Sequence, residues 1–333
     1  MYLEGNIGEF ALTCAVSKKK FTVGHSANLV INLKPQENHS SFYMYILENE
    51  FLTAKFNPLG AEWTSLISKK NGIEYIWQAS PDVWPRHAPN LFPIVGKVAN
   101  NSFTYQGQTY EIGQHGFARD WSFEVESASN DQLVFLLRSS PKTLKLYPFD
   151  FEFRVIYYLK NDGVRIVYSV KNPSATNILW FSVGAHPAFN IPLGNGGNFS
   201  DYYIAFSDKE TVGRYKIDGG LILPETSPVL EHSDILPLSK ELFLEDALVF
   251  KELKSTSMTI KSHKNDHFVR MDFQGFPFFG IWTKPGFDKF LCLEPWCGIA
   301  SSVGESSELI EKEGIISLVA GNSWEREFTV IVG

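Results

Sequence analysis

The sequence predicts an all-β protein, built as one large antiparallel β-sandwich. Apolar and polar residues alternate with a period of two through many short segments, as in strands that bury one face. Gly, Pro and Asn punctuate these segments, and long segments with helical periodicity are missing. Short strands joined by turns are typical of a sandwich or barrel, not of alternating β-α-β units. The 27 Phe, 13 Tyr and 8 Trp residues also favour β structure.

In chain order, the first clear strand is predicted at 45–57. A hairpin follows from 103–105 to 109–112, because Gln-Gly between them is suited to a turn. In 151–159 apolar residues occupy alternate positions, Asn-Asp-Gly then turns the chain, and 164–170 continues the alternation on the return strand. Other elements are strands at 132–138, 177–183, 202–206, 257–262, 267–273, 278–283, 289–293 and 324–332, and helical turns at 239–244 and 305–312, where Ser and Glu could start a helix.

No change of composition marks a domain boundary between residue 44 and residue 333, so this range is predicted to be a single domain. Residues 1–43 differ, with three consecutive lysines, a polar stretch and only modest alternation. We expect 1–43 to be an N-terminal extension, or Met44 to be the natural start. The alternative is one or two additional strands at the edge of the sandwich.

The composition and charge of the chain exclude several classes of binding partner. The net charge is −7 and the sequence pI is about 5.7, without a basic stripe, so neither nucleic acid nor an anionic membrane surface is expected as a partner. No apolar run approaches the ~20 residues of a membrane helix. The first residues lack the pattern of a signal peptide, and three cysteines argue against a disulfide framework. We therefore expect a cytoplasmic monomer or homodimer.

Three segments concentrate potential acid–base chemistry. His115 lies in His-Gly-Phe-Ala-Arg, His186 precedes a proline that restricts its backbone, and Glu294 lies between a leucine and Pro-Trp. Histidine titrates near pH ~6.5, and partial burial would raise the pKa of Glu294 and make it a better base. Trp296 offers a flat face for a sugar ring. The alternatives are core histidines, a structural buried ion pair for Glu294 and a core role for Trp296.

Further candidates are charged residues beside Pro, Gly or aromatic residues. Arg86, Lys97 and Arg119 could reach a ligand, and together they could hold a phosphate. The alternatives are a structural ion pair for Arg119 and solvated surface for Arg86 and Lys97. Asp246 precedes an apolar strand, where it could be a plain turn residue.

The sequence motifs of several other enzyme classes and binding sites are absent. There is no Gly-rich nucleotide fingerprint, no Gly-x-Ser-x-Gly elbow and no His-Glu-x-x-His motif. Cys292 and Cys297 are not spaced as a zinc-binding pair, so we interpret them as reduced core thiols. We expect neither a cofactor nor a metal.

At these residues the chain resembles the aldose 1-epimerase (galactose mutarotase) superfamily and looks closest to its LacX-like branch. The resemblance runs from about Met44 to Gly333 and includes five motifs in order, which are Leu91–Lys97, His115–Arg119, His186–Asn190, Asp246–Phe250 and Leu293–Trp296. It implies a large antiparallel β-sandwich with a sugar cleft. It also implies interconversion of sugar anomers without a cofactor.

The resemblance also implies residue roles. Glu294 would remove the proton of the anomeric hydroxyl and His186 would protonate the ring oxygen as the ring opens. His115 would hydrogen-bond the same region, and Asp246 would hold sugar hydroxyls. The alternatives are a non-catalytic sugar-binding or sensing protein on the same scaffold, and a glycoside hydrolase or lyase.

One motif departs from the galactose pattern. Where galactose mutarotases have Gly-Arg-x-x-Asn-Arg, this chain has Gly-Lys-Val-Ala-Asn-Asn from Gly96 to Asn101, which puts galactose itself in doubt. The His-Gly-Phe-Ala-Arg segment, with Arg86 upstream, also looks like that of hexose-6-phosphate mutarotases. The substrate implied is therefore a small sugar or a sugar phosphate.

Overall fold

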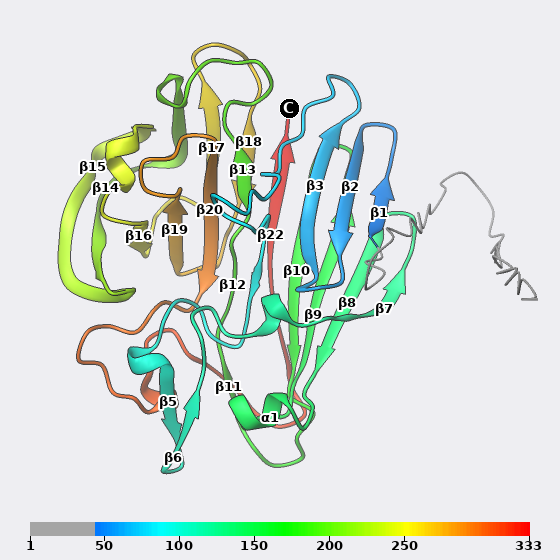
Figure 1. Ribbon diagram of the computed structural model, residues 1–333, viewed down its shortest axis with the longest axis vertical. Coiled ribbons are helices and arrows are strands. Elements are labelled where there is room, and N and C mark those ends of the chain that lie inside the picture. The colour runs from blue at the N-terminus through cyan, green and yellow to red at the C-terminus, as the bar shows by residue number, and fades with distance from the viewer. Residues whose placement is uncertain (1–43) are drawn as a thin grey trace, which may run out of the picture.

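The structure, a computed structural model, describes residues 44–333 and confirms the all-β prediction (Figure 1). Most strands belong to one antiparallel sheet of 15 strands. Its strands are β4 (Asn90–Leu91), β7 (Glu124–Ala128), β8 (Gln132–Arg138), β9 (Glu152–Leu159), β10 (Gly163–Lys171), β12 (Val183–Ala185), β13 (Ala188–Asn190), β14 (Tyr202–Asp218), β15 (Leu221–Pro237), β16 (Leu248–Lys251), β17 (Ser257–Ser262), β18 (Val269–Asp272), β19 (Phe278–Trp282), β20 (Phe290–Cys297) and β22 (Ser323–Val332).

The order of strands in this sheet is β4-β12-β20-β19-β16-β14-β17-β18-β22-β10-β9-β8-β7, with β13 also beside β20 and β15 beside β14. Three smaller sheets are formed by β1 (Tyr45–Glu48), β2 (Leu52–Asn57) and β3 (Glu62–Ser68), by β5 (Ser102–Tyr105) and β6 (Gln108–Glu111), and by β11 (Leu179–Phe181) and β21 (Ile316–Leu318).

Helices are short in the described part of the chain. They are the α-helix α1 (Thr143–Leu146) and the 3-10 helices η1 (Ala99–Asn101), η2 (Ala118–Asp120), η3 (Phe199–Asp201), η4 (Lys240–Phe243) and η5 (Leu309–Glu311). None of them has the length and apolar character that crossing a membrane requires.

Sheet β1–β3 packs face to face on the β7–β10 end of the large sheet, which makes the sandwich visible in Figure 1. The rings of Phe56 and Tyr157 lie 4.5 Å apart, and those of Tyr45 and Phe135 lie 5.8 Å apart, edge to face. Strand β9 alternates strictly between half-buried and buried residues. Its period-two pattern therefore places one face in the core between the two layers.

Both predicted hairpins are confirmed, as β5–β6 and β9–β10. The strand predicted at 45–57 is two strands, because the side chain of Asn49 accepts hydrogen bonds from the backbone of Phe51 and Leu52 and turns the chain. The strand predicted at 177–183 likewise divides into β11 and the start of β12, which pair with different partners. The predictions for residues 1–43 lie outside the described residues, and a single domain over 44–333 stays a prediction.

Strand β20 positions the candidate site. All eight of its residues are buried, because the sheet is covered on both sides there. Leu291 and Leu293 point into the main core, whereas Cys292, Glu294 and Trp296 alternate with them on the opposite face. A cavity opens on that second face.

Candidate active site

The cavity has a volume of about 330 Å³ and contains most of the predicted site residues. It is lined by Trp84, Gly96, Gln114, His115, Arg119, His186, Ile217, Gly220, Ile222, Asp246, Ala247, Val249, Trp282, Glu294, Trp296 and Ala300. The wall combines aromatic and aliphatic side chains with a few ionisable groups. This composition is typical of small-molecule sites.

Two glycines on neighbouring strands hold Trp296 flat against the sheet. Gly184 of β12 is the cross-strand partner of Trp296, and Gly280 of β19 is the partner of Glu294. A Cβ atom at Gly184 would lie 2.7 Å from Trp296 Cδ1, and one at Gly280 would lie 2.6 Å from Cη2 and Cζ2. The indole therefore occupies the space that side chains would fill on both flanking strands, and it forms part of the cavity wall.

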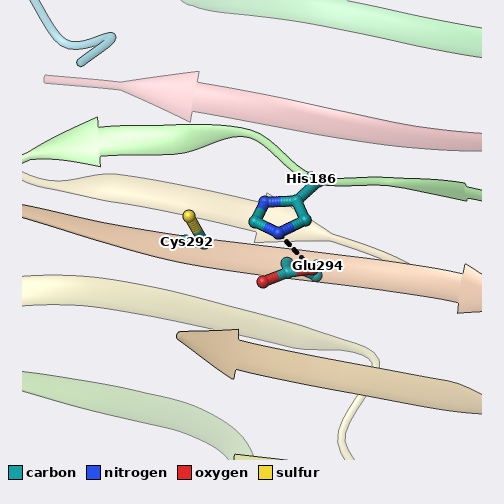
Figure 2. A group of neighbouring side chains, drawn as sticks. All are labelled: His186, Cys292 and Glu294. Carbon is teal, nitrogen blue, oxygen red and sulfur yellow. Dashed lines mark ion pairs between the residues drawn. The ribbon is translucent and has the colours of Figure 1, made fainter. Parts of the chain in front are cut away.

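His186 and Glu294 form the ionisable pair of the cavity. His186 Nε2 lies 3.2 Å from Glu294 Oε2, as Figure 2 shows. His186 comes from the turn between β12 and β13, where its backbone N–H donates to Pro89 O. Its ring stacks on Trp84 at 5.0 Å between centroids and meets the edge of Trp282 at 5.7 Å. The imidazole is thus fixed by aromatic contacts on two sides.

Burial makes the neutral forms of this pair the favoured ones. The pKa of Glu294 is raised well above its usual value, first by burial and then by the nearby carboxylate of Asp246. The pKa of His186 is lowered to about 3, chiefly by burial, with Arg119 and Arg86 adding repulsion. The pair consequently shares one proton over a wide range of pH.

His115 is held in an unusual backbone conformation. Its φ is +66°, in the left-handed region, and its backbone N–H donates to Gly96 O at 2.8 Å. In return, the backbone N–H of Gly96 donates to His115 Nδ1 at 3.1 Å. An imidazole that accepts at Nδ1 carries its proton at Nε2, so this nitrogen is the donor. Burial, followed by the charge of a protonated His186, lowers the pKa of His115 well below its usual value.

Gly116 explains why the chain can approach so closely here. Its φ is +70°, and a Cβ atom would lie 2.3 Å from Phe92 O. The backbone N–H groups of Phe117 and Ala118 both donate to the same carbonyl at 3.1 Å. A side chain at Gly116 would break this contact and displace the neighbouring His115.

Arg119 and Asp246 complete the ionisable wall. Arg119 lies in η2 and donates to Gln114 O at 2.8 Å, while its Nε lies 3.8 Å from Asp120 Oδ2 and is buried without a hydrogen-bond partner in the described residues. Burial and the charge of Arg86 lower the pKa of Arg119 to about 10, so it remains a cation near neutral pH. Asp246 precedes β16 with a φ of +81°, and its carboxylate accepts from the N–H of Ala247.

Arg86 and Lys97 do not line the cavity. Arg86 donates to Asp120 at 2.9 Å, next to Arg119. Lys97 Nζ donates to Gly219 O at 2.8 Å, at the turn between β14 and β15. The three predicted phosphate-binding cations therefore do not converge on one point: Arg86 and Arg119 are neighbours, and Lys97 contacts the hairpin.

The long hairpin β14–β15 and two aromatic residues are site components that sequence reasoning did not assign. Ile217, Gly220 and Ile222 at the end of the hairpin line the cavity, and the N–H of Ile222 donates to Ser301 O. Trp84 and Trp282 were visible as aromatic residues near Pro or at the end of a strand. Nothing in their spacing showed that they enclose His186.

Cys292 adds a third potential ligand atom beside the pair. It lies two residues before Glu294 on the same face of β20, and it is fully buried. The ligand atoms of His186, Cys292 and Glu294 all lie within 4.8 Å of one another. Chemically, the cavity thus combines a proton-sharing pair, a donor imidazole, a cation and aromatic walls.

The chain is similar to known proteins over most of its length. A curated relative, Protein LacX of Lactococcus lactis subsp. lactis, is 34% identical over 294 residues, which cover 86% of this chain and 98% of the relative. A galactose mutarotase related enzyme from Lactobacillus acidophilus is similar in structure, with a TM-score of 0.83, 36% identity and coverage of 87% of this chain and 97% of that one. A galactose mutarotase-like protein from Lactobacillus casei is also similar in structure, with a TM-score of 0.82 and 30% identity. The match covers 87% of this chain and 100% of that one.

The fold class predicted from the resemblance is therefore that of the solved relatives. A model of the family described as Aldose 1-epimerase matches residues 43–330, which is most of the chain. Together with the identity to the curated relative, this match shows that the chain belongs to the aldose 1-epimerase family.

Proposed function

We propose that the protein is a cofactor-independent aldose 1-epimerase that interconverts the α and β anomers of a hexose or a hexose phosphate. The observation that carries the proposal is the contact of 3.2 Å between His186 Nε2 and Glu294 Oε2 inside a cavity of sugar size. Ring opening needs a base at the anomeric hydroxyl and an acid at the ring oxygen, and this pair supplies both.

The proton balance of the pair explains its use. The reaction starts from the less favoured ionic form of the pair, in which Glu294 is the carboxylate and His186 the imidazolium. Glu294 takes the proton of the anomeric hydroxyl while His186 gives its proton to the ring oxygen, so the open-chain aldehyde is accompanied by a neutral pair. The pKa shifts of both residues favour that neutral form. Burial therefore stabilises the open-chain intermediate relative to the closed sugar.

The return half of the reaction reverses these transfers. After rotation about the C1–C2 bond, Glu294 protonates the aldehyde oxygen and His186 removes the proton of the attacking hydroxyl. In this proposal the N–H at His115 Nε2 hydrogen-bonds the reacting oxygens. Asp246 accepts from sugar hydroxyls, and Trp296 packs against the apolar face of the ring.

A phosphate on the sugar would be recognised by Arg119. It is the cation that lines the cavity among residues 44–333, and its buried Nε makes no hydrogen bond there. Arg86 would strengthen this end of the site as the neighbouring positive charge, while Lys97 would act through the hairpin turn that it contacts. A free hexose and a hexose phosphate thus differ in how strongly they need Arg119.

The test is anomer exchange measured by NMR saturation transfer on glucose, galactose and their 6-phosphates. We expect faster exchange for at least one sugar, and a loss of ~10²–10⁴-fold in Glu294→Gln with sugar binding retained. Glu325→Gln, at an exposed position on β22, is the matched control and should keep full activity. Full activity in Glu294→Gln would contradict the mechanism, and sugar binding without exchange in the wild type would favour a non-catalytic sugar-binding protein.

A further inference from the structure

Cys292 is a buried thiol at the catalytic pair that the proposed reaction does not use. Its side chain is fully buried and lies on the same face of β20 as Glu294. Figure 2 shows His186 reaching over this strand so that its ring lies next to both side chains. A thiol is not required for moving protons between sugar oxygens, but beside an imidazole and a carboxylate it can bind a metal ion.

We propose that His186, Cys292 and Glu294 form a binding site for a thiophilic divalent cation such as Zn²⁺, and that its occupancy inhibits the enzyme. The three ligand atoms lie within 4.8 Å of one another. Tetrahedral Zn²⁺ with bonds of ~2.0–2.3 Å holds its ligand atoms roughly 3.5 Å apart. The His186–Glu294 separation of 3.2 Å already meets this requirement, so modest side-chain rotation is all that remains.

The donor set selects the kind of metal. Imidazole nitrogen, thiolate sulfur and one carboxylate oxygen suit Zn²⁺ and Co²⁺, whereas Mg²⁺ and Ca²⁺ prefer oxygen ligands. Three protein ligands leave a fourth position, which could take water. His186 Nδ1 is buried without a partner in the described residues, unlike most metal-bound histidines. We therefore expect weaker binding than at a structural zinc site.

Inhibition follows from shared atoms. The metal would bind His186 Nε2 and the Glu294 carboxylate, which are the atoms that exchange protons with the sugar in the proposed function. Metal and productive sugar binding are then mutually exclusive, and saturating sugar should protect against the metal. The inhibitory part rests on the proposed function, whereas the binding part does not.

The test measures binding and activity separately. Co²⁺ is titrated into the wild type, Cys292→Ser and Cys297→Ser, and the thiolate-to-cobalt charge-transfer absorption is recorded, with Zn²⁺ as the competitor. Anomer exchange is measured in parallel with and without Zn²⁺ and then after a chelator. Cys297 is the matched control, because it is a second buried thiol on β20 that points away from the cavity into the main core.

The expected result is a cobalt–thiolate band in the wild type and Cys297→Ser that disappears in Cys292→Ser. Zn²⁺ should stop exchange reversibly in the wild type, while Cys292→Ser keeps its basal rate and needs at least ~10-fold more Zn²⁺. Equal Zn²⁺ sensitivity in Cys292→Ser, or a cobalt complex without the thiolate band, would overturn the proposal. If no sugar is exchanged but the band appears, the metal site stands and the proposed function fails.

Discussion

A methyl group at Gly280 tests whether the sheet holds Trp296 flat against the cavity wall. In Gly280→Ala the new Cβ would lie 2.6 Å from Trp296 Cη2 and Cζ2. Carbon atoms in contact are normally ~3.5–4.0 Å apart, so the overlap is about 1 Å. Strand β19 pairs with β16 and β20 on its two sides and cannot shift easily. The indole must therefore tilt into the cavity, at a cost of about 1–3 kcal/mol in the free energy of unfolding.

Urea unfolding followed by tryptophan fluorescence measures this cost, and sugar titration of the anomer exchange rate measures the effect on the cavity. We expect both a lower unfolding midpoint and a higher KM in Gly280→Ala. Gly113→Ala is the control, because a Cβ there meets no atom within 4 Å, and it should change stability by less than about 0.5 kcal/mol. Wild-type stability and KM in Gly280→Ala would refute the flat-indole reasoning.

Three further predictions concern charge. The lowered pKa of His115 keeps its ring neutral in the folded protein, while the unfolded chain protonates it below pH ~6.5. Stability should thus fall as pH drops below that value, by up to ~1.4 kcal/mol per pH unit from His115, and less steeply in His115→Gln, as urea unfolding at pH 7 and pH 5.5 would reveal. Lys97→Met removes the bond to Gly219 O and should loosen the hairpin turn by ~1 kcal/mol, seen as faster amide hydrogen exchange there; unchanged exchange would count against this role. Arg119→Gln should raise KM ~10–100-fold for a hexose 6-phosphate and much less for the free hexose, and equal losses for both would argue against a phosphate contact.

Sequence reasoning located the strands that have one buried face. Strands β9 and β10 were predicted almost to the residue, because their alternation reflects the core between two layers. The hairpin β14–β15 was predicted only at its first residues, 202–206. Most of its length is half-buried or exposed, so its sequence carries little apolar alternation. The two strands are nevertheless paired by backbone hydrogen bonds, which do not depend on the type of side chain and so cannot be predicted from the residue pattern.

The candidate site likewise contains residues that the local sequence predicts and contacts that only the fold creates. His115, His186 and Glu294 stood out because glycine or proline beside each one fixes an unusual local backbone. The convergence of Trp282 on His186 is a tertiary contact between distant strands, and no local pattern encodes it. The sequence also could not show that the three predicted phosphate-binding cations lie apart. Lys97 donates to a carbonyl more than a hundred residues away, which is a tertiary contact as well.

Strand β20 has a consequence for redesign. Its odd-numbered residues Leu291 and Leu293 anchor the sheet in the main core, while Cys292 and Trp296 lie on the cavity side. Because the two sets alternate along one backbone, the cavity wall can be varied at Trp296 while Glu294 and the residues that secure folding stay unchanged. Substitutions at this position would thus explore new substrates on a constant scaffold.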